Sequence, residues 1–425
     1  MAKLGSVEGR DGAAGLVEVL DYVRRHGTST RSALVEATGL SRVSVAQRLA
    51  ALVERDLLAE GDLARSTGGR APRTLRFRRE AGYLLVADIG ATSIDVAVAD
   101  LSGAILAYAA EPADIADGPD VILSRAEELF EECTAQASPL PGELWGIGIG
   151  VPGPVEFESG RPVTPPIMPG WNGYPVRERF AHHGVPVWVD NDANVMALGE
   201  HTAGLGRGTE NFVYVKIGTG IGAGVIVRGK LHRGTQGCAG DIGHIQVPVA
   251  GRDVICRCGN IDCLEALAGG AALQRDAEAA AREGRSPFLR AVLDENGALD
   301  ASDVARAAAH GDTTSMELFA SAGRHVGGVI AGIVNFFNPS LIVIGGGGAR
   351  AGDHLLASIR ETVYRRSLPL ATRNLVIHRS QLGGQEGVIG AAAMVTNELF
   401  APDFLARWLD AGTPVGQEHA ASVTG

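Results

Sequence analysis

Residues 240–270 read GDIGHIQVPVAGRDVICRCGNIDCLEALAGG, and this stretch restricts the fold of the chain more than any other. It holds one histidine and three cysteines within twenty positions: His244, Cys256, Cys258 and Cys263. Imidazole and thiolate side chains are typical ligands of tetrahedral zinc, and a site with four protein ligands is closed to substrate. We therefore predict that these residues bind a structural Zn²⁺. Three ordinary buried thiols are the alternative, which the spacing disfavours.

The same stretch carries oxygen acceptors beside the predicted metal loop. Asp241 precedes His244, and Glu265 follows Cys263 by two positions. A histidine that binds a metal through one ring nitrogen keeps the other nitrogen for a hydrogen bond. We expect Asp241, His244 and Glu265 to face one cavity and to bind sugar hydroxyls. A core histidine with satisfied hydrogen bonds is the alternative role for His244.

Length and composition indicate an α/β protein of two to three domains, because the chain has 425 residues, 45% hydrophobic content and 58 glycines. No apolar run is long enough to span a bilayer, and residues 1–15 lack the hydrophobic centre of a signal peptide. We therefore expect a cytoplasmic protein with no membrane partner. Four of the five cysteines lie between positions 238 and 263, which in a reducing compartment indicates metal binding.

Charge is distributed unevenly along the chain. Residues 1–80 carry 14 Lys and Arg against 10 Asp and Glu, whereas the remaining 345 residues carry 24 against 39. The net charge of −11 therefore combines a basic head with an acidic body. An acidic body alone disfavours nucleic-acid binding, but a basic head is what a separate DNA-binding module requires.

The head has the hydrophobic pattern of three helices. Apolar residues recur at helical spacing from Leu16 to Val23, and Gly27 follows as a stop signal. A short helix ending near Thr38 and a longer helix capped by Ser41 come next. The outer face of the longer helix carries side chains suited to phosphates and base edges, which predicts a recognition helix. These side chains are Arg42, Ser44, Gln47 and Arg48.

An arginine-rich segment follows the predicted recognition helix. Residues 63–79 contain six arginines and no acidic residue. The segment resembles a hairpin wing in which Arg70 and Arg73 contact a minor groove, where arginine is favoured. We therefore predict a disordered stretch over 1–14 and a winged helix-turn-helix that binds double-stranded DNA over 15–80. A three-helix domain used for protein contacts is the alternative.

Three glycine clusters follow apolar strands in the body. Such turns let backbone amides approach phosphate oxygens, and a carboxylate at a strand end can orient a hydrated Mg²⁺. The candidate ATP ligands are Asp88, Gly90 and Thr92 in the first cluster, Gly218, Thr219, Gly220 and Gly222 in the second, and Gly345, Gly346 and Gly347 in the third. Each turn alone is equally explained by packing, but three in order favour a nucleotide site.

A candidate catalytic group lies between the first two clusters. A strand over 187–189 runs into a helix, with Asp190, Asn191, Asp192 and Asn194 at the junction. A carboxylate at such a junction can accept a proton from an attacking hydroxyl, and a neighbouring amide can orient that hydroxyl. Helix capping is the alternative, although a cap needs only one such residue.

Taken together, these residues resemble the ROK family of repressors and sugar kinases, from Leu16 to about Leu399. The resemblance implies an actin-like, two-lobed ATPase fold (ribonuclease H-like) after the head, with a zinc-binding loop and with sugar and ATP meeting in the cleft. It further implies site roles in this chain. Asp192 is the general base if the chain is a kinase, Asn191 and Glu265 contact the sugar, His244 contacts zinc and sugar, and Cys256, Cys258 and Cys263 complete the metal site.

Several positions depart from the family pattern. Kinase members commonly read Asp-Ile-Gly-Gly-Thr-Lys in the first phosphate loop, where this chain has Ala91 and Ser93, which weakens the case for ATP. Asp241 stands where kinases usually have Glu, and Ile167 where many sugar-binding relatives have Asn. Asp262 replaces the Gly usual in the cysteine motif.

Two functions fit this pattern. The one we favour is a transcriptional regulator, a repressor of carbohydrate metabolism, whose body over 81–399 binds a sugar or sugar phosphate and whose head binds an operator as a homodimer or larger homo-oligomer. The other is an ATP- and Mg²⁺-dependent sugar kinase that carries a DNA-binding head. Residues 400–425 are expected to form a C-terminal tail.

Overall fold

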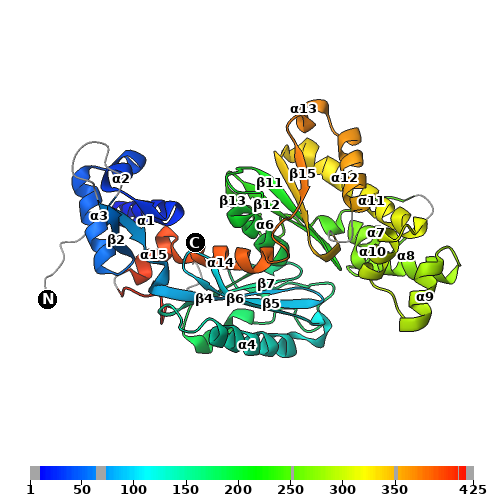
Figure 1. The fold of residues 1–425 in the computed structure, drawn as a ribbon, viewed down its shortest axis with the longest axis horizontal. Coiled ribbons are helices and arrows are strands. Elements are labelled where there is room, and N and C mark those ends of the chain that lie inside the picture. The colour runs from blue at the N-terminus through cyan, green and yellow to red at the C-terminus, as the bar shows by residue number, and fades with distance from the viewer. Residues whose placement is uncertain (1–9, 64–72, 250–252, 349–352, 410, 418–425) are drawn as a thin grey trace.

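The computed structural model describes residues 10–63, 73–249, 253–348, 353–409 and 411–417 (Figure 1). A small N-terminal head lies at one end of the molecule. Two α/β units follow it, each built around a five-stranded sheet. A helical region covers the far end, beyond the second sheet (Figure 1).

The head consists of three helices and a three-stranded antiparallel sheet of order β1-β3-β2. Its elements are α1 (Arg10–His26), β1 (Thr28–Ser29), α2 (Arg31–Thr38), α3 (Arg42–Glu54), β2 (Leu58–Leu63) and β3 (Arg73–Phe77). The Ser41 hydroxyl accepts a hydrogen bond from the Ser44 amide at 3.1 Å, which confirms the predicted cap of α3. Gly39 ends α2 in a left-handed conformation with φ 67°. Helix α1 begins at Arg10, within the stretch 1–14 for which disorder is predicted, and residues 1–9 lie outside the described residues.

The first sheet has the order β10-β7-β4-β5-β6. Strands β4, β5 and β6 form an antiparallel meander, while β7 and β10 add to β4 in parallel. Helix α4 (Pro119–Gln136) covers one face of the sheet (Figure 1). The strands are β4 (Gly82–Ile89), β5 (Ser93–Asp100), β6 (Ile105–Pro112), β7 (Glu143–Val151) and β10 (Val187–Asn191). Between β7 and β10 lie β8 (Val155–Glu156), β9 (Arg161–Pro162) and α5 (Val176–Arg179).

The second sheet repeats this arrangement, with the order β13-β12-β11-β14-β15 and the same alternation of strand directions. Its strands are β11 (Phe212–Ile217), β12 (Ile221–Val227), β13 (Lys230–Leu231), β14 (Leu341–Gly345) and β15 (Val376–Arg379). The helices around it are α7 (Leu264–Ala268), α8 (Gly270–Arg282), α9 (Pro287–Asn296), α10 (Ala301–Ala309), α11 (Thr313–Phe337), α12 (Asp353–Arg366) and α13 (Pro369–Thr372). The predicted α/β fold is confirmed.

Two helices pack against each other between the sheets: α6 (Asp192–Ala203) and α14 (Glu386–Leu399). They can approach closely because Gly199 and Gly390 have no side chain at their contact. A Cβ at either position would collide with the backbone of the other helix. Helix α6 contacts β11 and β12, whereas α14 contacts β4 and β7. The pair therefore joins the two sheets.

The segment predicted as a C-terminal tail, 400–425, contains a helix. Residues Pro402–Trp408 form helix α15, which contacts α1 of the head and lies between the head and β4 (Figure 1). The Trp408 ring is fully buried and meets the Trp145 ring edge-on, with the centroids 5.4 Å apart. Residues 418–425 lie outside the described residues.

No single helix in the part of the chain that the structure describes is long and apolar enough to cross a bilayer. The pair α14 and α15, bent by 69° at the break between them, meets the criteria of length and composition only when the two helices are counted together.

Candidate functional site

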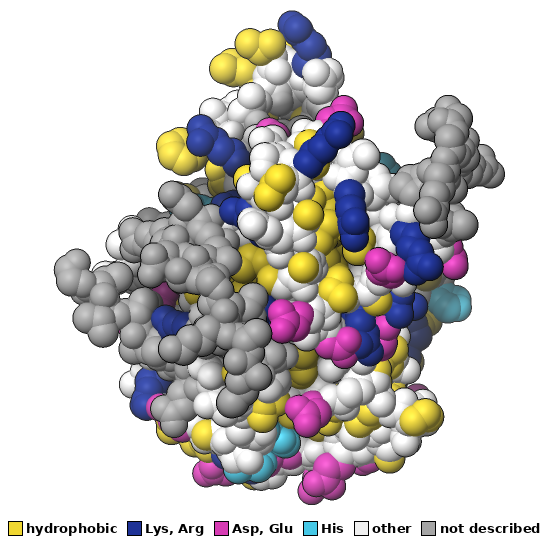
Figure 2. All heavy atoms as spheres, turned by 90° about the vertical axis from the view of Figure 1, so that its left-hand side faces the viewer, with side chains coloured by type: hydrophobic (Ala, Val, Ile, Leu, Met, Phe, Trp, Pro, Cys, Tyr) yellow, Lys and Arg dark blue, Asp and Glu magenta, His cyan; other side chains and the backbone are white. Residues whose placement is uncertain are grey.

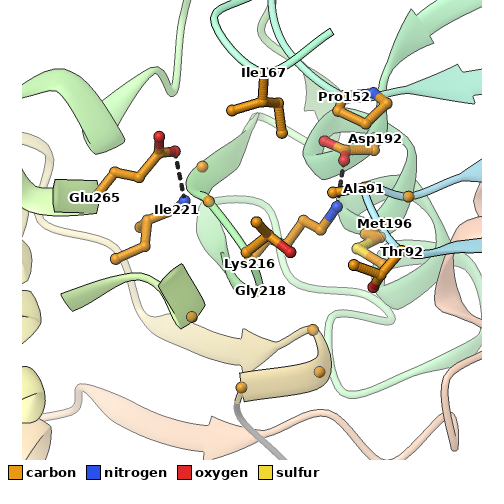
Figure 3. Close-up of a pocket in the computed structure, with 18 of the residues that line it drawn as sticks. Ala91, Thr92, Pro152, Ile167, Asp192, Met196, Lys216, Gly218, Ile221 and Glu265 are labelled. Carbon is orange, nitrogen blue, oxygen red and sulfur yellow. Dashed lines mark hydrogen bonds and ion pairs between the residues drawn. The ribbon is translucent and has the colours of Figure 1, made fainter. Parts of the chain in front are cut away.

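A cleft of about 1020 Å³ contains most of the predicted ligand-binding residues (Figure 3). Its walls come from the ends of β4, β7, β10 and β11, from the β11–β12 turn and from the loop that precedes α7. Five residues predicted to bind sugar line this one cleft, and they come from segments up to 74 positions apart in the chain: Asn191, Asp192, Asp241, His244 and Glu265.

Asn191 caps helix α6. Its side-chain oxygen accepts hydrogen bonds from the amides of Ala193 and Asn194 at 3.0 and 3.2 Å, and its side-chain amide donates to the Gly153 carbonyl at 2.8 Å. Asp190, one residue earlier, accepts from the Arg233 guanidinium at 2.7 Å. Helix capping, the alternative considered for this junction, is therefore one role of Asn191, which still lines the cleft.

Asp192 faces the cleft at the first position of α6. Its carboxylate accepts a hydrogen bond from the Ala193 amide at 2.7 Å and forms an ion pair with Lys216 (Figure 3). Lys216 lies near the end of β11, with 17% of its side chain exposed. Burial lowers the pKa of the Lys216 ammonium, but Asp192, Asp88 and Asp95 outweigh burial and raise that pKa overall. Lys216 therefore stays protonated beside the candidate base.

Asp88 is buried at the end of β4. Burial raises the pKa of Asp88 well above its ordinary value, Lys216 opposes this rise, and the carboxylates of Asp192 and Asp95 add to it. The neutral form of Asp88 is thus favoured. The Asp95 carboxylate accepts hydrogen bonds from the hydroxyls of Ser93, at 3.1 Å, and Tyr108, at 2.5 Å.

The predicted ATP ligands come together at the cleft, with one exception. The residues that line it are Gly90 and Thr92, the β11–β12 turn residues Gly218, Thr219 and Gly220, Gly222 in β12, and Gly346 and Gly347. Gly345 instead lines a smaller cavity of about 340 Å³ next to it, together with Gly346, Arg379 and Glu386. A Cβ on Gly220 would collide with the Glu265 carboxylate, so that turn depends on glycine.

Glu265 supports the β11–β12 turn, since its carboxylate accepts a hydrogen bond from the Ile221 amide at 3.2 Å (Figure 3). Burial raises the pKa of Glu265, and His244 opposes the rise. Asp241 is exposed and lines the cleft, as does the half-buried His244. These three residues lie together as predicted.

The four predicted metal ligands form one cluster. One donor atom from each of His244, Cys256, Cys258 and Cys263 lies within 4.8 Å of all the others. The Cys258 and Cys263 sulfurs are 3.7 Å apart, and Cys256 Sγ is 3.7 Å from His244 Nδ1. Tetrahedral zinc with Zn–S bonds of about 2.3 Å requires a sulfur–sulfur separation of about 3.8 Å. The donor set therefore fits Zn²⁺, and His244 Nε2 remains for the cleft.

Three residues that depart from the family pattern lie in the metal loop or at the cleft. Asp262 has φ 57°, a left-handed conformation that Asp tolerates better than most residues, and its carboxylate accepts a hydrogen bond from the Val254 amide at 2.9 Å. Ile167 and Ala91 line the cleft (Figure 3). The metal loop thus keeps its shape without the usual glycine.

The predicted DNA-binding side chains differ in their exposure. Arg42 and Gln47 are exposed on α3, while Ser44 is half-buried. The Arg48 guanidinium folds back against α1 beside Gly15 and donates to the Ser44 carbonyl at 3.3 Å. Arg73 forms an exposed ion pair with Glu60, and Arg70 lies outside the described residues. In the view onto the head end, Lys and Arg side chains lie across the middle of the face, with acidic side chains between and below them (Figure 2).

Sequence reasoning missed the cation in the cleft. Lys216 stands within the stretch KIGTGIGAGVIV and is the charged residue of an otherwise apolar strand, FVYVKI. A charge in such a strand was a usable signal, because a buried ammonium needs a carboxylate partner. The exposed Val43 at the start of α3, with 67% relative exposure, was also missed.

Comparison with protein families gives one match that covers most of the body. Residues 85–398 match the model of the ROK family. A putative xylose repressor from Caldicellulosiruptor sp. (strain Rt8B.4) is 29% identical over 391 residues, which cover 91% of this chain and 96% of that protein.

Two solved structures extend the comparison. The crystal structure of a ROK family transcriptional regulator, a homologue of the E. coli MLC protein, is 26% identical, covers 95% of this chain and 100% of its own, and has a TM-score of 0.79. A ROK family glucokinase from Streptomyces griseus, solved with glucose and AMPPNP, is 30% identical, covers 74% of this chain and 99% of its own, and has a TM-score of 0.64.

Proposed function

Because this chain belongs to the ROK family, we propose that it is a repressor of carbohydrate metabolism that binds operator DNA through its head and a sugar or sugar phosphate in its cleft. The head is the observation that carries the proposal, since three helices and a three-stranded sheet precede the family region. The similar glucokinase structure covers 74% of the chain, whereas the similar regulator structure covers 95%. A regulator therefore accounts for the head and a kinase does not.

The head acts as a winged helix-turn-helix. Helices α2 and α3 form the helix-turn-helix, and the β2–β3 hairpin is the wing. Helix α3 enters the major groove with Arg42 and Gln47, both exposed, toward the bases. Val43 lies beside them and suits contact with a thymine methyl group. A homodimer reads two half-sites, as helix-turn-helix proteins commonly do.

The body acts as the ligand sensor. Residues 81–399 have the two-lobed, actin-like arrangement, in which two similar sheets enclose a cleft. Asp241, His244 and Glu265 bind sugar hydroxyls from one side of the cleft, while Asn191 and Asp192 bind them from the other. A bound Zn²⁺ would hold His244 through Nδ1, fix its ring and keep the loop that carries it in place.

Binding experiments test the proposal directly. DNA from upstream of the protein's own gene should show a protected site in footprinting and a shifted band in gels at moderate salt, and a sugar or sugar phosphate should change that affinity. A ligand changes the affinity only if it prefers one conformation of the body. A protein that protects no site in this DNA would not be the repressor proposed here.

A sugar kinase is the second candidate, because Asp192 faces the same cleft as the glycine turns. Phosphoryl transfer would require Asp192 to accept the proton of a sugar hydroxyl. A coupled assay of ADP release over a panel of hexoses, pentoses and amino sugars distinguishes the candidates. Turnover that disappears in Asp192→Asn would establish the kinase, and no turnover with any sugar would remove it.

A further inference from the structure

Lys216 lies among three carboxylates at the point where the two sheets meet the cleft. Its ammonium is ion-paired with Asp192, and the carboxyl groups of Asp88 and Asp95 are close enough to raise its pKa. The side chain of Asp192 is 7% exposed and that of Lys216 is 17% exposed. At such low exposure an ion pair is poorly screened by solvent and salt.

A phosphoryl-transfer cleft normally neutralises its carboxylates and the phosphates of the nucleotide with a divalent cation. Here the ammonium already supplies a positive charge, and two of the carboxylates have other partners. Asp192 binds Lys216 and the Ala193 amide, and Asp95 accepts from two hydroxyls.

These residues do not fit Mg²⁺–ATP. A second cation beside Lys216 would be repelled by the ammonium. The ion pair also joins α6 to β11.

We propose that Lys216 takes the place of the divalent cation in this cleft, so that the sugar binds without Mg²⁺ or ATP and is not phosphorylated. This rests on the proposed function only in taking the cleft as a sugar site. The cationic role of Lys216 follows from its own contacts.

Binding of Mn²⁺, a paramagnetic probe for a Mg²⁺ site, tests the role of Lys216. Free Mn²⁺ is followed by electron paramagnetic resonance while the zinc-loaded, full-length protein is titrated. Wild-type protein should bind no Mn²⁺ at the cleft in the millimolar range, and Lys216→Met should gain one site at least about tenfold tighter. The site should disappear in the double variant Lys216→Met/Asp192→Asn, and Lys216→Arg should behave as wild type.

A purely structural ion pair would affect melting temperature but would create no Mn²⁺ site. A wild-type Mn²⁺ site that Asp88→Asn abolishes would overturn the proposal, and so would a folded Lys216→Met protein without a new site. If Lys216→Met does not fold, Lys216→Gln takes its place, and the wild-type titration by itself can still contradict the proposal.

Calorimetry with glucose and xylose gives the second readout on unmodified protein. Whichever sugar binds to the zinc-loaded protein should do so with the same affinity, within about twofold, without added Mg²⁺ and with it, and with or without ATP. Tightening by Mg²⁺ of more than about tenfold would overturn the proposal. If no sugar alters operator binding, the proposed repressor function fails, while the Mn²⁺ titration still decides the role of Lys216.

Discussion

At the scale of single residues, His244 connects the metal cluster to the ligand cleft. Its Nδ1 faces the Cys256 sulfur at 3.7 Å, and the residue lines the cleft. One side chain thus serves two proposed sites. Loss of this imidazole should weaken both metal binding and sugar binding. Loss of a thiolate should weaken sugar binding only because the metal is lost.

The first prediction concerns His244→Ala and Cys258→Ser. Wild-type protein should contain about one zinc per chain by metal analysis, and both variants should lose most of it, because a tetrahedral site with three ligands binds more weakly. A thermal-shift assay should show that His244→Ala loses its sugar response even with excess zinc, while Cys258→Ser recovers part of it.

The control for this prediction is a second group of potential ligands, Glu127, His182 and His183, on α4 and the turn before β10. Substituting His182 by Ala should leave the zinc content unchanged. Retention of a full equivalent of zinc in Cys258→Ser would place the metal outside the predicted cluster.

The second prediction concerns the pH dependence of stability through Asp88. Its carboxyl has an ordinary value of 3.8, and burial raises the pKa well above this in the folded protein. A carboxyl with a higher pKa in the folded than in the unfolded chain takes up a proton on folding, so stability falls as pH rises above 3.8 towards the folded pKa. Asp88→Asn removes this titration and should be increasingly stabilised over wild type as the pH rises.

Thermal melts of both proteins between pH 5 and pH 8.5 measure this effect. The two curves should diverge as the pH rises, with the Asp88→Asn protein melting at the higher temperature. The exposed residue Asp117, changed to Asn, is the matched control. Parallel curves for wild type and Asp88→Asn would contradict the assigned burial effect.

At the scale of elements, local sequence patterns predicted those features of helices and strands that depend on residues close together in the chain. The cap of α3 by Ser41, the end of α2 at Thr38 and the strand-to-helix junction at Asp192 all depend on short-range hydrogen bonds, and such bonds can be predicted from the sequence. The metal cluster was also predictable, because cysteine and histidine spacing reflects ligand geometry.

Contacts between distant segments were not predictable in this way. Lys216 and Asp192 are 24 positions apart and lie on different elements. The periodicity of residues within one element cannot predict such an ion pair. The burial of α15 was missed for a related reason. Its seven residues are too few for a helical period, and its partners in α1 are nearly 400 positions away.

The third prediction concerns helix α3 and its exposed side chains. Gln47→Ala and Arg42→Ala should each weaken specific operator binding by about 1–3 kcal/mol, because polar side chains near the N-terminus of a recognition helix reach base edges. Arg73→Ala should have a smaller effect, since Arg73 is already paired with Glu60 at 2.6 Å. Arg125, ion-paired with Glu111 on the body, provides a charge-matched control when changed to Ala.

Fluorescence anisotropy with operator and scrambled DNA separates specific from non-specific binding for these variants. Equal losses on both DNAs would show that the side chain contacts phosphates. An unchanged affinity for Gln47→Ala would mean that another face of the head reads the DNA.

At the scale of the whole molecule, the head and the body share one hydrophobic core. Buried residues of α1 and α3 belong to the same cluster as those of α14 and α15. Phe77 of the head meets Phe400 at 5.5 Å between ring centroids, and Arg55 donates to the Leu409 carbonyl at 2.8 Å. The other end of α14 lies against Asp88, since a Cβ on Gly387 would collide with that carboxyl. Helices α14 and α15 therefore connect the cleft to the head.

The fourth prediction tests this connection at Trp408. Its indole nitrogen donates to the Leu399 carbonyl at 3.0 Å, and its ring fills the space between α15 and Trp145. Trp408→Ala should cost about 3–5 kcal/mol in urea unfolding, and the operator affinity should stop responding to sugar, while the cleft still binds sugar. Trp408→Phe keeps most of the packing and should lose about 1 kcal/mol with the hydrogen bond. A Trp408→Ala protein with a normal sugar response would show that the signal takes another route.

The last prediction concerns the homodimer. The end of the molecule that carries α13 lies away from the head (Figure 1). Three apolar side chains near the end of α11 and the start of α13 are exposed: Phe336 by 94%, Leu368 by 69% and Leu370 by 72%. The Asn335 side chain accepts a hydrogen bond from the Leu368 amide at 3.1 Å, so the end of α11 and the start of α13 are held together. Clustered exposed apolar side chains are typical of protein–protein contacts.

Light scattering should give a mass of twice the 44.1 kDa of one chain for the wild-type protein. The double variant Phe336→Asp/Leu370→Asp should have the mass of a single chain. The monomeric variant should keep its sugar binding but lose about tenfold or more in operator affinity, because two half-sites no longer bind together. The exposed apolar residue Val121 on α4, changed to Asp, is the control. A double variant that remains dimeric would place the dimer contact on another surface.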